Sequence, residues 1–183
     1  MNASSPVQSL DQREPPLSGF SRCHDGILSR LESFAQLPAL SAAAERARQV
    51  AGDTVVLFEP LVLQHHADEE AELFVAVLRS ATPGQETTWV SAMVQRLTVE
   101  HRNIEALWKQ VKPSVKAAAA GKPADPDPAA IAELVSRYQS HAQFEEQEFL
   151  PLARQILGRD SNHLAALGLA LHMRHVPLPV GYI

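Results

Sequence analysis

The sequence predicts an all-α protein, an antiparallel up-down four-helix bundle with an additional short C-terminal helix. Apolar residues recur at helical spacing along most of the 183 residues, whereas few segments alternate apolar and polar residues. Aromatic residues, which are enriched in strands, make up only 5% of the chain. Turn residues divide the helical pattern into four long stretches, and long helices joined by mostly short turns usually form an antiparallel bundle.

The first two predicted helices are separated by a proline. Apolar residues follow helical spacing over residues 20–37, and Pro38 closes that segment. Ser41 is the expected N-cap of the second helix, which continues to about residue 80. Pro60 lies inside the second helix and should bend or break it there, because proline has no amide hydrogen to donate.

A proline-rich loop separates the third and fourth predicted helices. The loop covers residues 121–128, with three prolines, and Gly158 ends the fourth helix. Pro113 can kink the third helix or end it early. The expected ranges are 87–120 for the third helix, 129–157 for the fourth and 161–172 for a shorter fifth helix.

Length and composition indicate one ordinary globular domain. The chain is 45% hydrophobic and 20% charged, which is typical of a protein with a full apolar core. We expect the bundle to occupy residues 19–158. The Ser/Pro/Gln-rich residues 1–18 are expected to be disordered, and residues 159–183 to form a C-terminal helix and an extended tail packed on the bundle.

Charge and cysteine content argue against several classes of partner. The formal net charge is −5 without a long cluster of basic residues, so nucleic acid is not an expected partner. The apolar stretches are too short to span a bilayer, and the N-terminus lacks the pattern of a signal peptide. Cys23 is the only cysteine and is expected to be a small buried thiol. A cytoplasmic protein that does not bind membranes is the simplest interpretation.

One short pattern occurs twice. It reads HHADEEAELF from His65 and HAQFEEQEFL from His141. In both copies a glutamate follows the histidine by four residues, and a pair of large apolar residues follows eight and nine residues after it. Four residues are about one turn of α-helix, so an imidazole and a carboxylate lie on one face and can bind the same metal ion.

Each of the four long helices carries one candidate histidine ligand, and two helices add a glutamate. In an antiparallel bundle these side chains can converge at one level of the core. Imidazole and carboxylate without thiolate suit iron, manganese or zinc, and two carboxylates that can bridge suit a pair of ions. The predicted ligands are His24, His65, Glu69, His101, His141 and Glu145.

The doubled histidine leaves a choice of register, because His66 and Glu70 have the same spacing as His65 and Glu69. Counting from His65 reproduces the apolar pair of the second copy, so His65 and Glu69 are the preferred ligands. His66 and Glu70 would then lie about 100° around the helix, toward a neighbouring helix or solvent. They remain alternative ligands.

Several other polar residues near the motifs have more than one interpretation. Glu105 follows His101 by one turn and is either an extra ligand or a hydrogen-bond partner of a ligand. For Glu146 and Glu70 we favour a solvated carboxylate or such a partner. His172 and His175 are one turn apart and are expected to pack or to cap the fifth helix, with a minor metal site as the alternative.

Over residues 20–155 these motifs resemble the hemerythrin family, specifically the bacterial HHE domains. The resemblance rests on His24 in the first helix, on Glu100-His101 in the third and on the two repeated segments, the second of which ends in Pro151. It implies a non-haem centre of two iron ions, oxo- or hydroxo-bridged, with zinc or manganese as alternatives. By the same resemblance His24 and His65 would serve one iron, His101 and His141 the other, and Glu69 and Glu145 would bridge.

The chain differs from oxygen-carrying hemerythrins at two positions. They have a further histidine where this chain has Glu105, and a bridging aspartate where it has Glu145. It looks more like the iron-cluster-repair and iron-sensing branches. We therefore expect a metal-binding protein, rather than an established enzyme, that senses, carries or stores O₂, NO or iron. Repair of iron–sulfur centres or reduction of NO or peroxide is the alternative, and the apolar fifth helix could serve a homodimer.

Overall fold

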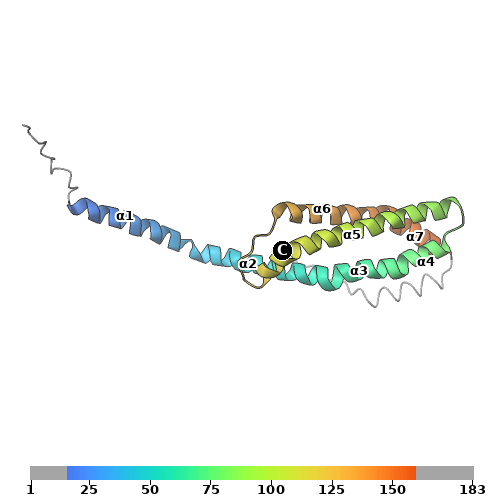
Figure 1. The fold of residues 1–183 in the computed structure, drawn as a ribbon, viewed down its shortest axis with the longest axis horizontal. Helices are drawn as coiled ribbons and strands as arrows, with labels where there is room; N and C mark the ends of the chain where they lie inside the picture. Colours follow the sequence, from blue (N-terminus) through green and yellow to red (C-terminus); the bar gives the residue numbers. More distant parts are fainter. Residues whose placement is uncertain (1–15, 160–183) are drawn as a thin grey trace, which may run out of the picture. The chain divides into compact units, whose positions relative to one another are not determined.

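The structure is a computed structural model that describes residues 16–159, and over these residues it is helical without a strand (Figure 1). The predicted all-α class is therefore confirmed. The α-helices are α1 (Pro16–Ala35), α2 (Leu37–Val56), α3 (Leu63–Asp68), α4 (Phe74–Ser80), α5 (Gln85–Ala119), α6 (Pro128–Phe144) and α7 (Leu150–Leu157). Three π-helical turns lie between them: η1 (Leu57–Val62), η2 (Glu69–Leu73) and η3 (Glu145–Phe149). The expected disordered segment and the expected fifth helix lie largely or wholly outside the described residues.

The chain divides into two compact units, Met1–Arg46 and Ala47–Ile183. In the first unit, α1 and α2 are separated by Gln36 alone. The expected boundary at Pro38 and the cap at Ser41 are wrong: α2 begins at Leu37, and its first turn tolerates a proline because amides there have no helical acceptor. That the first helix is the fourth member of the bundle stays a prediction.

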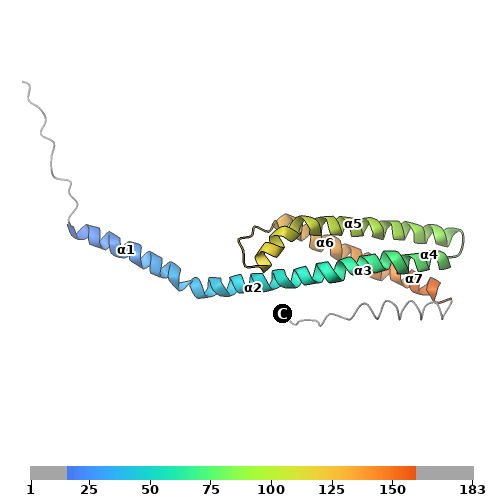
Figure 2. The same cartoon turned by 60° about the horizontal axis from the view of Figure 1, so that its bottom comes forward.

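Three antiparallel helical segments form the described part of the second unit (Figures 1 and 2). The first runs from residue 47 through α3 and α4 to Ser80, the second is α5, and the third runs from α6 through η3 to α7. A short turn joins α4 to α5, and α5 continues past Pro113 to Ala119. Asp127 caps α6 by accepting hydrogen bonds from the amides of Ala129 and Ala130, at 2.9 and 3.2 Å.

The core of the second unit consists of two apolar clusters. One joins η2, α4, the first half of α5, η3 and α7, and contains Phe74, Leu97 and Phe149 among its buried residues. The other joins α2, η1, the second half of α5 and the start of α6, and contains Phe58 and Trp108. On each of the three segments the buried histidine lies between the residues of the two clusters. A polar layer therefore separates two apolar layers.

The π-helical turns were not foreseen, and two of them fall at equivalent places in the repeated motif. The amide of Phe74 donates to the carbonyl of Glu69, and the amide of Leu150 donates to that of Glu145. In an ordinary α-helix a residue nine positions after a histidine lies on the opposite side, at about 100° per residue. The extra residue of a π-turn shifts the rotation of the residues that follow it, and Phe74, directly after η2, is 2% exposed.

The third π-turn contains Pro60. We expected the helix to bend or break there. The structure shows no break: the helix continues and widens over η1, where the amide of Leu63 donates to the carbonyl of Phe58. Widening accommodates a residue that cannot donate to the preceding turn.

Candidate metal centre

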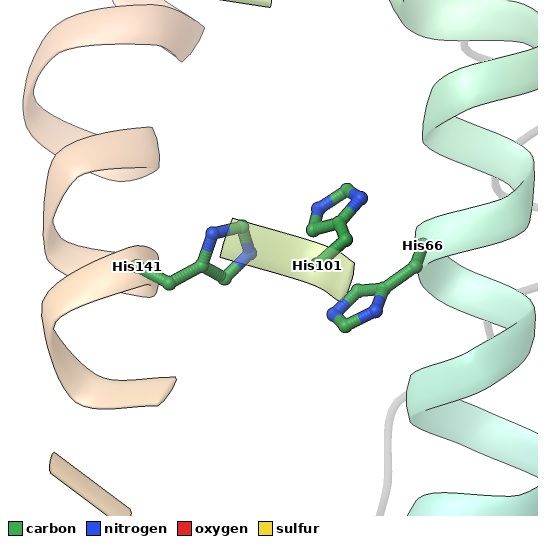
Figure 3. Close-up of side chains that lie close together, drawn as sticks. All are labelled: His66, His101 and His141. Carbon is green, nitrogen blue, oxygen red and sulfur yellow. The ribbon is translucent and has the colours of Figure 1, made fainter. Parts of the chain in front are cut away.

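Three imidazole rings meet in the polar layer. His66 comes from α3, His101 from α5 and His141 from α6, and their rings lie close together (Figure 3). The rings of His66 and His101 stack with centroids 3.9 Å apart, and His141 presents its edge to His101 at 4.8 Å. The three residues are 0%, 0% and 2% exposed, so the rings have no access to bulk water.

Each of these three rings contacts a glutamate through Nδ1. The Nδ1 atom lies 3.3 Å from Glu105 for His66, 2.9 Å from Glu70 for His101 and 3.3 Å from Glu100 for His141. A carboxylate accepts a hydrogen bond, so each contact favours the tautomer that carries its proton on Nδ1. The lone pair of Nε2 is then available inside the bundle, as in metal-binding histidines.

All three Nε2 atoms are buried without a hydrogen-bond partner. Buried polar atoms normally have partners, because leaving one unpaired costs about 1–3 kcal/mol. Each of the three histidines also offers one ring nitrogen that lies within 4.8 Å of those of the other two. This arrangement is expected of ligands that bind one cation. The donor chemistry of the site therefore fits a metal ion.

A second group of candidate ligands lies beside the first. His65, Glu69 and Glu145 place one ligand atom each within 4.8 Å of one another, and His65 Nε2 lies 3.1 Å from Glu69 Oε1. The carboxylates also approach the first group, with Glu69 Oε2 3.4 Å from His101 Nε2 and Glu145 Oε2 3.8 Å from His141 Nε2. The contact between Glu69 and His101 is not aligned as a hydrogen bond, since both atoms have no hydrogen-bond partner. Glu69 and Glu145 therefore belong to the second group and adjoin the imidazoles of the first.

Burial dominates the electrostatics of this layer. It raises the pKa of Glu145 to about 8, with a further contribution from the adjoining Glu69 carboxyl, and it also raises the pKa of Glu69. It lowers the pKa of His66 to about 2, with smaller contributions from His101 and His141. Burial likewise lowers the pKa of His141. Without a metal ion the site therefore favours neutral His66 and His141 and a protonated Glu145 carboxyl, and a bound cation would displace that proton.

These pKa values predict how the stability of the metal-free protein depends on pH. The pKa of Glu145 is about 8 in the folded chain and 4.5 ordinarily, so the folded state binds more protons in that interval and stability falls as pH rises. His66 has the opposite effect, but only between about 2 and 6.5. The melting temperature of the metal-free protein should therefore decrease from pH 6.5 to 8. A constant or increasing melting temperature over that interval would contradict this assignment.

The structure brings together five of the six predicted ligands. His65, Glu69, His101, His141 and Glu145 lie in one layer. The remaining one, His24, is exposed on α1 in the first unit, and its role as a ligand stays a prediction. His163, His172 and His175 lie outside the described residues.

The preferred register placed His66 toward a neighbouring helix or solvent. Its ring is fully buried and stacks on His101 of the neighbouring helix α5, beside the other ligand atoms. His65, the preferred residue, has a side chain that is 37% exposed. Both histidines take part in the polar layer, because His66 belongs to the group of three imidazoles and the adjacent His65 belongs to the group with Glu69 and Glu145. Which of them holds a metal ion stays a prediction.

The other polar residues near the motifs are also placed. Glu70 and Glu105 contact the imidazoles of His101 and His66, which agrees with the role of a hydrogen-bond partner considered for each. Glu146 is exposed. Cys23, expected to be buried, is exposed on α1.

Glu100 was not foreseen as a partner of a histidine on another helix. It adjoins His101 in the sequence but contacts His141 across the interface between α5 and α6. The spacing of residues along one helix does not predict a contact with a residue on another helix.

Aromatic side chains line both sides of the polar layer. Phe74 lies 5.8 Å from the His101 ring and packs edge-on against Phe149. On the other side, Tyr138 lies 6.0 Å from the His141 ring. Trp108 is 2% exposed and stacks on Phe58, so it belongs to the wall of the core.

The core of this helical bundle holds buried imidazoles and carboxylates whose ligand atoms face inward and lack hydrogen-bond partners. These features define a class of protein, the histidine–carboxylate cation-binding bundles. The comparison with known families agrees. The profile described as the hemerythrin HHE cation binding domain matches residues 16–153, and the chain belongs to this family. No curated protein and no solved structure matches it. Among the described residues, no helix has the length and apolar character needed to cross a membrane.

Proposed function

We propose that this HHE protein holds two iron ions in its polar layer and uses them to sense, carry or store O₂, NO or iron. The observation that carries the proposal is the pair of adjoining ligand groups, with buried nitrogen and oxygen atoms that have no hydrogen-bond partner. One group consists of neutral imidazoles and the other contains two carboxylates. This combination suits iron better than a soft metal.

The residues that would hold the ions follow from the two groups. His66, His101 and His141 would bind one ion, and His65, Glu69 and Glu145 the other. Because Glu69 and Glu145 each approach a histidine of the first group, they can bridge the two ions. His24 is an additional proposed ligand, on the resemblance alone. Bound iron would supply exchange between ferrous and ferric states and a position for a diatomic ligand.

The protein's own residues prepare the site for this use. Glu70, Glu100 and Glu105 keep the Nδ1 protons in place, so that the Nε2 lone pairs face inward. Phe74 and Tyr138 border the histidines on opposite sides and limit the access of water. A small ligand would therefore meet a polar site shielded from bulk water, in which electrostatic interactions are stronger than in water.

Anaerobic loading with ferrous iron tests the proposal. Metal-free protein should bind about two ions per chain, as expected for a site with two bridging carboxylates. A stoichiometry near zero would refute metal binding by this layer.

The loaded protein should then be exposed to O₂ and to NO while its absorption spectrum is recorded. A reversible change supports sensing or carriage. Rapid irreversible oxidation would instead favour the alternative role in iron–sulfur repair or in reduction of NO or peroxide.

A further inference from the structure

One arginine contacts the carboxylates behind two of the three buried histidines. The guanidinium of Arg102 forms an ion pair with Glu70 Oε2 through one terminal nitrogen. Its other terminal nitrogen donates to Glu105, at 3.1 Å from both carboxylate oxygens. A single planar group therefore holds two carboxylates at once, which is the geometry that a guanidinium provides.

The same two carboxylates contact imidazoles from different helices. Glu70 Oε1 lies 2.9 Å from Nδ1 of His101 on α5, and Glu105 Oε1 lies 3.3 Å from Nδ1 of His66 on α3. Arg102 is thus connected through one carboxylate to each ring of the stacked pair. Among the described residues no hydrogen bond joins its guanidinium to either ring, and apart from a minor Coulombic effect on His66 its influence on the ligands passes through Glu70 and Glu105.

We infer that Arg102 is a positioning residue that sets the tautomer and orientation of His66 and His101. Glu70 and Glu105 are partly exposed, at 23% and 28% for their side chains, and two neighbouring carboxylates repel each other. Without the guanidinium they could turn toward water and leave the Nδ1 atoms. Fixing both carboxylates keeps the two Nε2 lone pairs directed into the layer.

The third histidine provides a comparison within the same molecule. His141 contacts Glu100 Oε2, and Glu100 Oε1 accepts from Nε of Arg96 at 2.7 Å. Arg102 takes no part in this connection. An effect that passes through Glu70 and Glu105 should therefore change His66 and His101 but leave His141 as it is.

The alternative is that Arg102 forms surface ion pairs of no consequence for the site, since exposed pairs contribute only about 0–1 kcal/mol. Arg137 offers a matched control, because it pairs with Glu133 one turn away on α6 at 2.8 Å and lies at the surface. Replacement of Arg137 removes a guanidinium–carboxylate pair whose carboxylate, Glu133, is not one of the three glutamates that contact the buried histidines.

The test uses long-range ¹H–¹⁵N correlation spectra of the imidazoles in the metal-free protein. Arg102→Gln should increase the Nε2-protonated tautomer of His66 and His101 and leave the signals of His141 unchanged. Arg137→Gln should change none of the three. Unchanged tautomers in Arg102→Gln, or an equal change in all three histidines, would overturn the inference.

Arg102→Lys separates the planar fork from the positive charge. An ammonium on a flexible chain is a point charge without the fork that engages two carboxylates, so lysine should not restore the wild-type spectra. Full restoration by lysine would show that charge alone suffices and would overturn positioning by the fork.

Metal affinity provides a second readout, which rests on the proposed function. Arg102→Gln should weaken binding of the ion at the three imidazoles by about tenfold or more, as is typical when a hydrogen-bond partner of a ligand is disturbed. Affinity equal to that of Arg137→Gln would contradict this step. Because the spectra are recorded without metal, they test the role of Arg102 even if the protein binds no iron.

Discussion

Replacement of His66 with alanine is expected to lower the iron stoichiometry from about two ions per chain to about one. His66 supplies one of three buried Nε2 atoms and stacks on the ring of His101. Its removal leaves two imidazoles for that ion and opens a cavity beside His101. The other group, with His65, Glu69 and Glu145, keeps all of its ligand atoms. Iron per chain, measured after anaerobic loading and desalting, gives the result.

His65→Ala is the matched variant, because it removes the adjacent imidazole from the other group. This variant should also bind about one ion, held by the three buried histidines His66, His101 and His141. Circular dichroism of both metal-free variants shows whether they fold. If folded His66→Ala binds as much iron as the wild type while His65→Ala loses iron, the register inferred from the apolar pairs is correct and the ligand role of His66 is refuted.

Replacement of Glu145 with methionine is expected to stabilise the metal-free protein at pH 8 and to impair metal binding. Burial beside Glu69 disfavours the ionised form of Glu145, and its Oε1 has no hydrogen-bond partner. Methionine has a similar length and no polar atom to desolvate. The free energy of unfolding should rise by about 1 kcal/mol, because the unpaired Oε1 is removed while the hydrogen bond with Glu69 is also lost. Chemical denaturation in the presence of a chelator measures it.

Glu148→Met is the control for this second prediction. Glu148 belongs to the same π-turn, η3, but is exposed, so its replacement should change stability by less than about 0.5 kcal/mol and should leave metal binding intact. Equal stability of Glu145→Met and the wild type at pH 8 would show that burial of the Glu145 carboxyl does not destabilise the folded protein. Unchanged iron stoichiometry would show that Glu145 is not a ligand.

Much of the local structure follows from patterns within single helices. The long helices and the Gly158 terminus were predicted from apolar spacing and turn residues, and they are observed within a few residues. The errors lie at prolines. Pro38 occupies the tolerant first turn of α2, and Pro60 is accommodated by a π-turn, so neither ends a helix. Proline interrupts a helix only where its missing amide would have donated to the preceding turn and the backbone does not adjust.

The sequence by itself determined the all-α class and five residues of the polar layer, His65, Glu69, His101, His141 and Glu145. Helical periodicity relates residues three or four apart on one element, and those relations survive folding. Only the tertiary structure decided that His66 faces His101, that Glu100 reaches His141, and that Arg102 joins Glu70 to Glu105. These contacts depend on how the packed helices are rotated and offset along their axes. Helical periodicity does not determine either quantity, and the π-turns change both further.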